Sequence, residues 1–308
     1  MKAVTYNRYG GPEVLEYGEI CEPRVGPDSV LVAVRAAAVN PVDWKVQAGY
    51  LDALIEARFP VVPGWDMSGV VVRPGVDTPE FKENDEVMGY VREDFLAHGT
   101  FAEYVAAPVR TLAHKPKSLD FAQAAGLPLA GLTAYQALTK VLDLAKGETL
   151  LVHAAAGGVG SMAVQLAVHL GARVIGTASE YNHDYLRKLG AEPVVYGPGL
   201  VGRIRALAPD GVDAALDLVG GQALAVTGDV LRVPGRVASI ADQQVIGLGG
   251  RYYWTRPDAR DLAALADLAD TGTLRVEVAH TFPLERAADA QRLSAERHTR
   301  GKIVVKVS

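Results

Sequence analysis

The sequence predicts an α/β protein of two domains, a small β-barrel or sandwich followed by a doubly wound parallel sheet. Short apolar runs separated by Gly and Pro fill residues 1–118, as in a small all-β domain. From residue 148 onward strands alternate with helices, which is typical of a parallel sheet with right-handed crossovers. A glycine-rich turn joins the first of these strands to its helix, which is typical of dinucleotide-binding domains.

The β-rich part contains several short apolar runs bounded by turn residues. We expect strands at 30–35, 69–72, 85–90 and 101–106. The pattern changes near Ser118, where residues 118–125 resemble a capped helix start, and residues 133–138 predict a second helix.

The second part alternates strands and helices. We expect its strands near 149–153, 172–176, 193–196, 213–217 and 236–240. An amphipathic helix is expected at 261–268, and strand patterns return at 275–278 and 302–307. The C-terminal segment is therefore expected to rejoin the β-rich domain.

The glycine-rich turn follows the apolar run Leu150 to Val152 and opens an apolar-periodic helix. Backbone N–H groups at such a helix start face a pyrophosphate, and the helix dipole favours its negative charge. Gly157 allows the backbone to approach phosphates, and Gly160 allows close packing of the helix on the strand, whereas Ala155 replaces the first glycine of the usual pattern. The predicted phosphate-binding residues are Ala156, Gly157, Gly158, Val159 and Gly160.

Composition excludes several other classes. The net charge of −5 argues against a nucleic-acid surface, and Cys21 is the only cysteine, so a cysteine-based zinc cluster is not expected. The first residues alternate like a strand rather than a signal peptide, and we find no apolar run of ~18 residues that would predict a membrane span. A cytoplasmic protein with no membrane partner is the resulting expectation.

Several motifs in order along the whole chain carry a family resemblance. They are Asn40-Pro41-Val42-Asp43, the stretch 63–69, Gly99-Thr100-Phe101-Ala102-Glu103-Tyr104, the stretch 131–138, the turn 153–160, Asp217-Leu218-Val219-Gly220 and Gly301-Lys302-Ile303-Val304. With these motifs the chain resembles the zinc-independent quinone oxidoreductases of the medium-chain dehydrogenase/reductase superfamily. The resemblance implies a GroES-like β-barrel-type catalytic domain of residues 1–118 and 272–308, a Rossmann domain of residues 119–271, and an active-site cleft between them.

The residues at the family's zinc positions argue against a metal. The resemblance places Asn40 where zinc-dependent relatives carry a first Cys ligand, and Trp65 where they carry a His. Zinc needs three or four converging ligands, so we expect no functional metal. Without a Lewis acid, the acceptor must be activated by hydrogen bonds or be intrinsically electrophilic, which favours quinones and conjugated enones.

The end of the second Rossmann strand favours NADPH. Ala178 occupies the position where NAD enzymes carry an acidic residue for the ribose, and its absence admits a 2′-phosphate. Ser179 and Asn182 are candidate hydrogen-bond donors and Arg187 a candidate cation, although Arg187 is equally well read as part of a solvated helix face. Glu180 argues mildly in the opposite direction because it adds negative charge.

The resemblance also implies residues at the nicotinamide end. Those expected near the cofactor are Asn40, Asp43, Thr133, Val219, Gly220, Tyr253, Trp254 and Lys302. Tyr50 is a candidate to hydrogen-bond the acceptor or donate a proton, or else it only shapes the pocket. Asp43 is likewise either catalytic or a structural cap of the helix that begins near Trp44.

The leading hypothesis is therefore NADPH-dependent reduction of a quinone or similar conjugated carbonyl by a homodimer. Two alternatives remain open. One keeps the fold and reduces an enoyl or alkenal carbon–carbon double bond, possibly in trans in polyketide-type biosynthesis. The other is a non-catalytic NADPH-binding protein.

Overall fold

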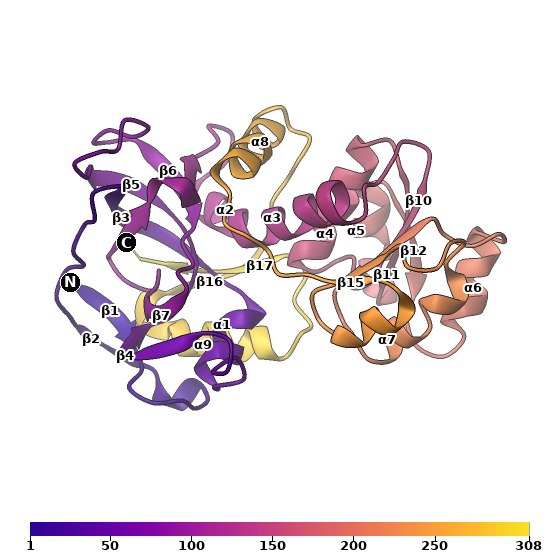
Figure 1. Ribbon diagram of the computed structural model, residues 1–308, viewed down its shortest axis with the longest axis horizontal. Coiled ribbons are helices and arrows are strands. Elements are labelled where there is room, and N and C mark those ends of the chain that lie inside the picture. The colour runs from indigo at the N-terminus through magenta and orange to yellow at the C-terminus, as the bar shows by residue number, and fades with distance from the viewer. Residues whose placement is uncertain (308) are drawn as a thin grey trace. The chain divides into compact units, whose positions relative to one another are not determined.

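The computed structural model describes residues 1–307, and these fold into two compact units (Figure 1). The first unit comprises Met1–Leu129, Pro257–Gly272 and residues 276–307, and the second comprises Ala130–Arg256 and Thr273–Arg275. Two segments that the sequence boundaries placed in the Rossmann domain, 119–129 and 257–271, thus belong to the first unit. The reason is packing, because the helices in these segments lie against strands of the first unit's sheet.

The first unit is built on one large, mostly antiparallel sheet. Its strands are ordered β16 (Val278–Pro283), β17 (Lys302–Lys306), β3 (Ser29–Val39), β5 (Asp66–Arg73), β6 (Glu86–Tyr90) and β9 (Leu112–His114), with β8 (Tyr104–Pro108) also paired to β3. Two small sheets pair β1 (Lys2–Thr5) with β2 (Glu16–Glu19), and β4 (Glu56–Val62) with β7 (Phe95–His98). The predicted return of the C-terminal segment to the β-rich domain is confirmed, because β17 pairs with β3.

Four α-helices complete the described part of the first unit. They are α1 (Pro41–Gln47), α2 (Phe121–Gly126), α8 (Ala259–Asp270) and α9 (Ala287–Ala295), with 3-10 turns η1 (Pro12–Val14), η2 (Val109–Thr111) and η7 (Leu284–Arg286). Helix α2 begins later than the predicted start at Ser118, because Asp120 caps it and exchanges hydrogen bonds with Gln123. Alternating apolar side chains of β3, β5 and β17, among them Val32, Met67 and Val305, form the core.

The second unit contains a six-stranded sheet in which all neighbouring strands are parallel. The strand order is β12 (Ala191–Val195), β11 (Arg173–Ala178), β10 (Thr149–Val152), β13 (Ala214–Asp217), β14 (Val237–Ser239) and β15 (Arg251–Tyr252). When the strands are numbered by their order along the chain, they run 3-2-1-4-5-6 across the sheet. This is the expected doubly wound arrangement. The strand order reverses between β10 and β13, so dinucleotides are expected at the carboxyl ends of these strands.

Helices connect the strands of this sheet. They are α3 (Pro128–Gln136), within which the chain passes from one unit to the other, α4 (Gly158–His169), α5 (His183–Lys188), α6 (Leu200–Leu207) and α7 (Gln222–Ala225). Shorter helical turns are η3 (Ala137–Val141), a π-type turn, η4 (Glu180–Asn182), η5 (Gly228–Val230) and η6 (Gln243–Leu248). Ile204 and Leu224, from α6 and α7, pack with Leu151 and Ile175 on the sheet. Within residues 1–307 no helix has both the length and the apolar character needed to span a membrane.

Candidate functional site

The glycine-rich turn lies at the carboxyl end of β10, directly before α4. Gly157 is the N-cap of α4 and supplies no side-chain cap, and Ser161 makes the first helical hydrogen bond, to the Gly157 carbonyl at 2.9 Å. Gly157, Gly158 and Val159 are half-buried, so the start of the helix is accessible. This arrangement fits an anion, because the first N–H groups of a helix have no internal acceptor.

The two glycines at the ends of the turn have different structural roles. A Cβ on Gly160 would lie 2.3 Å from the Ala154 carbonyl oxygen, so this position requires glycine for close packing, as the sequence indicated. A Cβ on Gly157 would come no closer than 3.4 Å to the same oxygen. The folded chain alone does not require glycine at 157, whereas close approach of a phosphate would.

The predicted 2′-phosphate residues follow β11. The Asn182 amide donates to Ser179 Oγ at 3.2 Å, and Asn182 Oδ1 is buried without a partner. Arg187 is exposed and forms an ion pair with Asp184 at 2.7 Å. Ser179 and Asn182 are thus brought together, while Arg187 is engaged by a neighbouring carboxylate on its own helix.

The loop after β13 is held by the buried Asp217. Its Oδ1 accepts from the N–H groups of Val219 and Gly220, each at 3.0 Å, and its Oδ2 accepts from Ser239 Oγ at 2.6 Å. Gly220 has φ +79°, which an L side chain adopts with strain. The Val219 side chain remains 48% exposed, so the loop presents this side chain rather than its N–H groups.

Three further predicted residues of the second unit lie near one another. Tyr253 donates its hydroxyl to the Thr133 carbonyl at 2.6 Å, and the Thr133 and Thr255 hydroxyls are 2.8 Å apart. Both Thr133 and Tyr253 are buried, and Trp254 is half-buried. The Tyr253 hydroxyl is therefore engaged within the protein.

In the first unit, Asn40, Asp43, Asp66 and Lys302 form a buried group that we call the Lys302 cluster. Lys302 Nζ donates to Asn40 Oδ1 at 2.5 Å and lies 3.9 Å from Asp66 Oδ2. Asn40 Nδ2 donates to Asp66 Oδ2 at 3.0 Å, and Asp66 Oδ1 accepts from the Leu129 N–H at 2.9 Å. Asn40 thus joins the ammonium to the carboxylate, and both of its amide atoms are occupied.

Asp43 adds a second carboxylate to the Lys302 cluster. Its Oδ2 accepts from the Asn40 N–H at 2.7 Å, while Oδ1 is buried without a partner. It lies in the first turn of α1, which begins at Pro41 rather than near Trp44, and it accepts from the cap residue as a structural cap partner would.

Burial controls the titration of the Lys302 cluster. It raises the pKa of Asp43 to about 7, and it raises the pKa of Asp66 to about 6 against the opposing effects of Lys302 and Asn40. It also lowers the pKa of the Lys302 ammonium, while the two carboxylates act in the opposite direction.

Tyr50 lies apart from the buried groups. It follows α1 in the loop before β4 and is 72% exposed. Its hydroxyl is therefore accessible to a small molecule, in contrast to those of Tyr253 and Tyr6.

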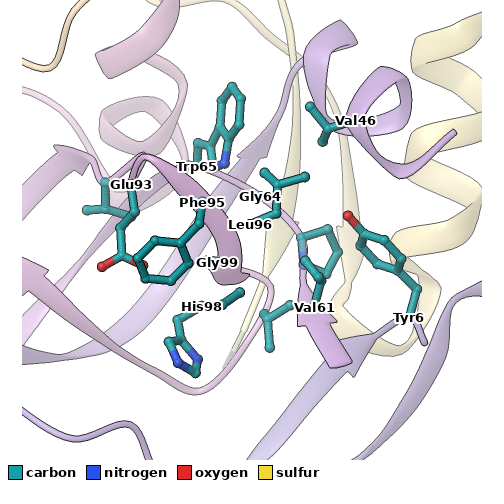
Figure 2. A pocket seen from close by; sticks show the side chains of 14 residues that line it. Tyr6, Val46, Val61, Gly64, Trp65, Glu93, Phe95, Leu96, His98 and Gly99 are labelled. Atoms are coloured by element: carbon teal, nitrogen blue, oxygen red, sulfur yellow. The ribbon is translucent and has the colours of Figure 1, made fainter. Parts of the chain in front are cut away.

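A small cavity in the first unit contains a buried hydroxyl without a partner. Its volume of about 10 Å³ suits a single water rather than an organic acceptor. Figure 2 shows Tyr6 and Glu93 on opposite sides of this cavity, with Trp65 and Leu96 among the residues that line it. Tyr6 Oη and Glu93 Oε2 are both buried without a hydrogen-bond partner.

Asp66 and His153 are polar residues that sequence reasoning did not place in the site. Asp66 begins the buried strand β5, and a lysine within the apolar strand 302–306 signals the need for a buried carboxylate. His153 lies between the apolar strand β10 and the glycine-rich turn and is fully buried. In residues 1–307 no group of three or more His, Cys, Asp or Glu side chains is arranged to hold a metal ion.

Two family models match the chain. A model described as alcohol dehydrogenase GroES-like domain matches residues 26–117, and one described as zinc-binding dehydrogenase matches residues 189–305. The first match spans strands β3 to β9 of the first unit. The second begins with strands β12 to β15 of the second unit and continues into α8, β16, α9 and β17 of the first.

The chain is also similar over nearly its whole length to known oxidoreductases. The chain is 38% identical to the chloroplastic NADPH-dependent alkenal/one oxidoreductase of Arabidopsis thaliana, over 99% of this chain and 79% of that protein. The solved quinone oxidoreductase of Coxiella burnetii superposes with a TM-score of 0.88 and 34% identity, over 100% of this chain and 99% of that one. Mycobacterial Rv1454c complexed with NADPH superposes with a TM-score of 0.86 and 29% identity, over 100% of both chains.

Proposed function

The chain belongs to the quinone oxidoreductase-like family of the medium-chain dehydrogenase/reductase superfamily, and from this premise we propose that it transfers hydride from NADPH to a quinone or a similar conjugated carbonyl. It is an NADPH-dependent oxidoreductase. The observation that carries the proposal is the accessible, uncapped start of α4 at the point where the strand order of the parallel sheet reverses.

When bound, NADPH supplies the hydride, and the residues around the start of α4 hold it. The Gly157 N–H donates to the Ala154 carbonyl at 3.0 Å, so the groups that we assign to the pyrophosphate are the N–H groups of Gly158, Val159 and Gly160 at the start of α4. Ala178 leaves the end of β11 without a carboxylate that would repel a 2′-phosphate, and Ser179 and Asn182 lie next to it. Arg187 reaches the phosphate only by leaving Asp184, so we assign it a secondary role.

At the acceptor end we propose different roles for the three predicted catalytic residues. Tyr50 is the exposed one, so its hydroxyl donates a hydrogen bond or proton to the acceptor oxygen. Asn40 and Asp43 are buried and already bonded to Lys302, to Asp66 or to each other, so they act as positioning residues.

We also propose that the reaction needs no zinc, although one matching family model is described as zinc-binding. Asn40 and Trp65 occupy the positions of two ligands in the zinc-dependent relatives, and neither side chain is a thiolate or imidazole. Asp66, which follows Trp65, bonds to Asn40 and lies beside Lys302.

We further propose that the protein acts as a homodimer in the cytoplasm. The Arabidopsis relative, in contrast, is named as chloroplastic.

The test is NADPH oxidation by the purified protein with 1,4-benzoquinone and, in parallel, with a 2-enal. Turnover with the quinone supports the proposal, whereas turnover with the enal alone assigns the chain to carbon–carbon double-bond reduction. Tight NADPH binding without turnover of either acceptor contradicts the proposal and favours a non-catalytic protein. Chelator treatment of the active protein should leave the rate unchanged, and a loss restored by zinc would refute zinc independence.

Tyr50→Phe tests the proposed donor. It should lower kcat with the preferred acceptor by about 10-fold or more, since it removes one hydrogen bond or proton donor while keeping the ring. NADPH affinity should not change. An unchanged kcat would assign Tyr50 to pocket shape alone.

A further inference from the structure

We propose that His153 is a positioning residue of the NADPH site, which fixes the glycine-rich turn through Thr177 and links it to helix α7 through Thr227. The inference rests on the proposed cofactor site, and all of its residues lie within the second unit. We call His153, Thr177 and Thr227 the His153 cluster.

The hydrogen bonds of His153 determine its tautomer. The ring is fully buried, and Nε2 lies 2.9 Å from Thr227 Oγ1. Thr227 Oγ1 donates its own proton to the Ala223 carbonyl at 2.8 Å, so it accepts from His153 and the ring proton is on Nε2. Nδ1 is then an acceptor, and Thr177 Oγ1 faces it at 3.4 Å.

Thr177 holds the first residues of the glycine-rich turn. Its Oγ1 accepts from the Ala154 N–H at 3.1 Å, and its carbonyl accepts from the Ala155 N–H at 2.9 Å. Ala154 has φ +50°, a left-handed conformation that is unfavourable for an alanine and persists only where neighbours enforce it. His153 orients the Thr177 hydroxyl and thereby helps to maintain the backbone conformation of Ala154.

On its other side, His153 is connected to the loop that follows β13. Its N–H donates to the Leu216 carbonyl at 3.0 Å, one residue before Asp217, which holds the N–H groups of Val219 and Gly220. Thr227 lies just after α7, the helix that follows this loop. The His153 cluster thus connects the two loops that flank the reversal of strand order, where the dinucleotide is expected.

The cluster works with a neutral ring. Burial lowers the pKa of His153 to about 4, against the opposing effect of the Asp217 charge. An apolar side chain would fill the same space without the cost of burying two ring nitrogens. The hydrogen bonds that offset this cost run to the elements that shape the site, which is why we assign a positioning role rather than a packing role.

Three variants with NADPH titration by fluorescence test the proposal. His153→Leu removes both hydrogen bonds and should raise the Kd for NADPH about 10-fold, as expected for loss of one or two buried hydrogen bonds. Thr177→Val should have a similar effect, because it releases the turn directly. His153→Asn retains an acceptor near the Nδ1 position and should keep the Kd within about threefold.

Steady-state kinetics should separate positioning from general damage. In His153→Leu the KM for NADPH should rise with the Kd, while kcat at saturating NADPH and the KM for the acceptor stay within about twofold. Thr111→Val is the matched control, because it removes a buried hydroxyl that donates to the Pro108 carbonyl at 2.7 Å in the first unit. It should change thermal stability but not NADPH affinity.

The outcomes are distinguishable. An unchanged Kd in His153→Leu, or an equal rise in Thr111→Val, overturns the inference about His153. Binding of NADPH by the wild-type protein in the same experiment upholds the proposed cofactor. Failure of the wild-type protein itself to bind NADPH refutes the proposed cofactor and the inference together. If His153→Leu does not fold, Thr177→Val decides between these outcomes.

Discussion

The two units bury polar side chains in opposite ways. The Lys302 cluster of the first unit contains one ammonium and two carboxylates, all nearly inaccessible to water. The His153 cluster of the second unit uses only neutral groups, a histidine and two threonines. Charged groups are costly to bury and are costlier still when one partner is lost, whereas neutral hydrogen bonds contribute about 1 kcal/mol each. The comparison predicts that substitutions in the Lys302 cluster will lower the free energy of unfolding more than substitutions in the His153 cluster.

The largest effect is expected from Lys302→Met, which keeps most of the side-chain volume and removes the ammonium. Asp43 and Asp66 would then be buried without a cation, and the free energy of unfolding should fall by about 3–5 kcal/mol. Urea unfolding near neutral pH measures the loss. In the double variant Lys302→Met/Asp66→Asn most of the stability should return, since one buried charge is also removed. If the free energy of unfolding of Lys302→Met lies within about 1 kcal/mol of the wild-type value, the interpretation of the Lys302 cluster as a charged group is contradicted.

The pH dependence of stability should differ in sign between the two clusters. Burial raises the pKa of Asp43 from 3.8 to about 7, so the folded protein binds more protons than the unfolded chain in that range. The contribution of Asp43 is then most favourable below its unfolded pKa and is lost as pH rises toward 7. Burial lowers the pKa of His153 from 6.5 to about 4, so its contribution is present above 6.5 and is lost as pH falls.

Urea unfolding of Asp43→Asn and His153→Asn across this pH range measures both effects. The stability of Asp43→Asn relative to wild type should increase with pH, and that of His153→Asn should decrease with pH. Each change should be on the order of 3 kcal/mol over its full window. Parallel curves for the two variants would show that the clusters do not differ in charge.

Within the second unit, the two glycines of the turn provide a smaller contrast. Gly160→Ala forces a Cβ against the Ala154 carbonyl and should cost about 1–3 kcal/mol of stability. Gly157→Ala should leave stability within about 0.5 kcal/mol but weaken NADPH binding, because only the cofactor's phosphate needs that space. Thermal unfolding and NADPH titration of both variants test this, and equal stabilities would contradict the packing role of Gly160.

Among the substitutions of buried polar side chains, the smallest effect is expected from Thr255→Val, which removes a neutral hydroxyl from its pair with Thr133. The free energy of unfolding should fall by about 1 kcal/mol, well below the loss in Lys302→Met. Urea unfolding under the same conditions gives the comparison. A loss of about 3 kcal/mol or more would show that neutral pairs in the second unit matter as much as the charged cluster.

The fold was largely predictable, because periodicity and turn residues act locally. The alternation of strands and helices from 149 onward and the glycine-rich turn predicted the parallel sheet and the approximate positions of its first five strands along the chain. The two-residue strand β15 was not predicted, since it is too short to show a period. Helices α2 and α8 were assigned to the other domain because their sequences do not reveal which sheet they pack against.

The site was less predictable, because its buried partners are distant in sequence. Asn40 and Lys302 are 262 positions apart, and no local pattern links them or points to Asp66. His153 is likewise isolated in the sequence from its partners Thr177 and Thr227, which are 24 and 74 positions away. A buried polar residue reveals its role only when the fold supplies the partner.

The connectivity of the first unit has a consequence for synthesis on the ribosome. Its sheet is interrupted by the whole of the second unit, which is almost one continuous segment, Ala130–Arg256. Chains elongate from the N-terminus, so nearly all of the second unit emerges before β17 and can fold as a domain. Asp43 and Asp66 are made early, and their cation arrives only with Lys302. Until then the nascent first unit carries two carboxylates without their cation, and β17 delivers both that cation and the strand that pairs with β3.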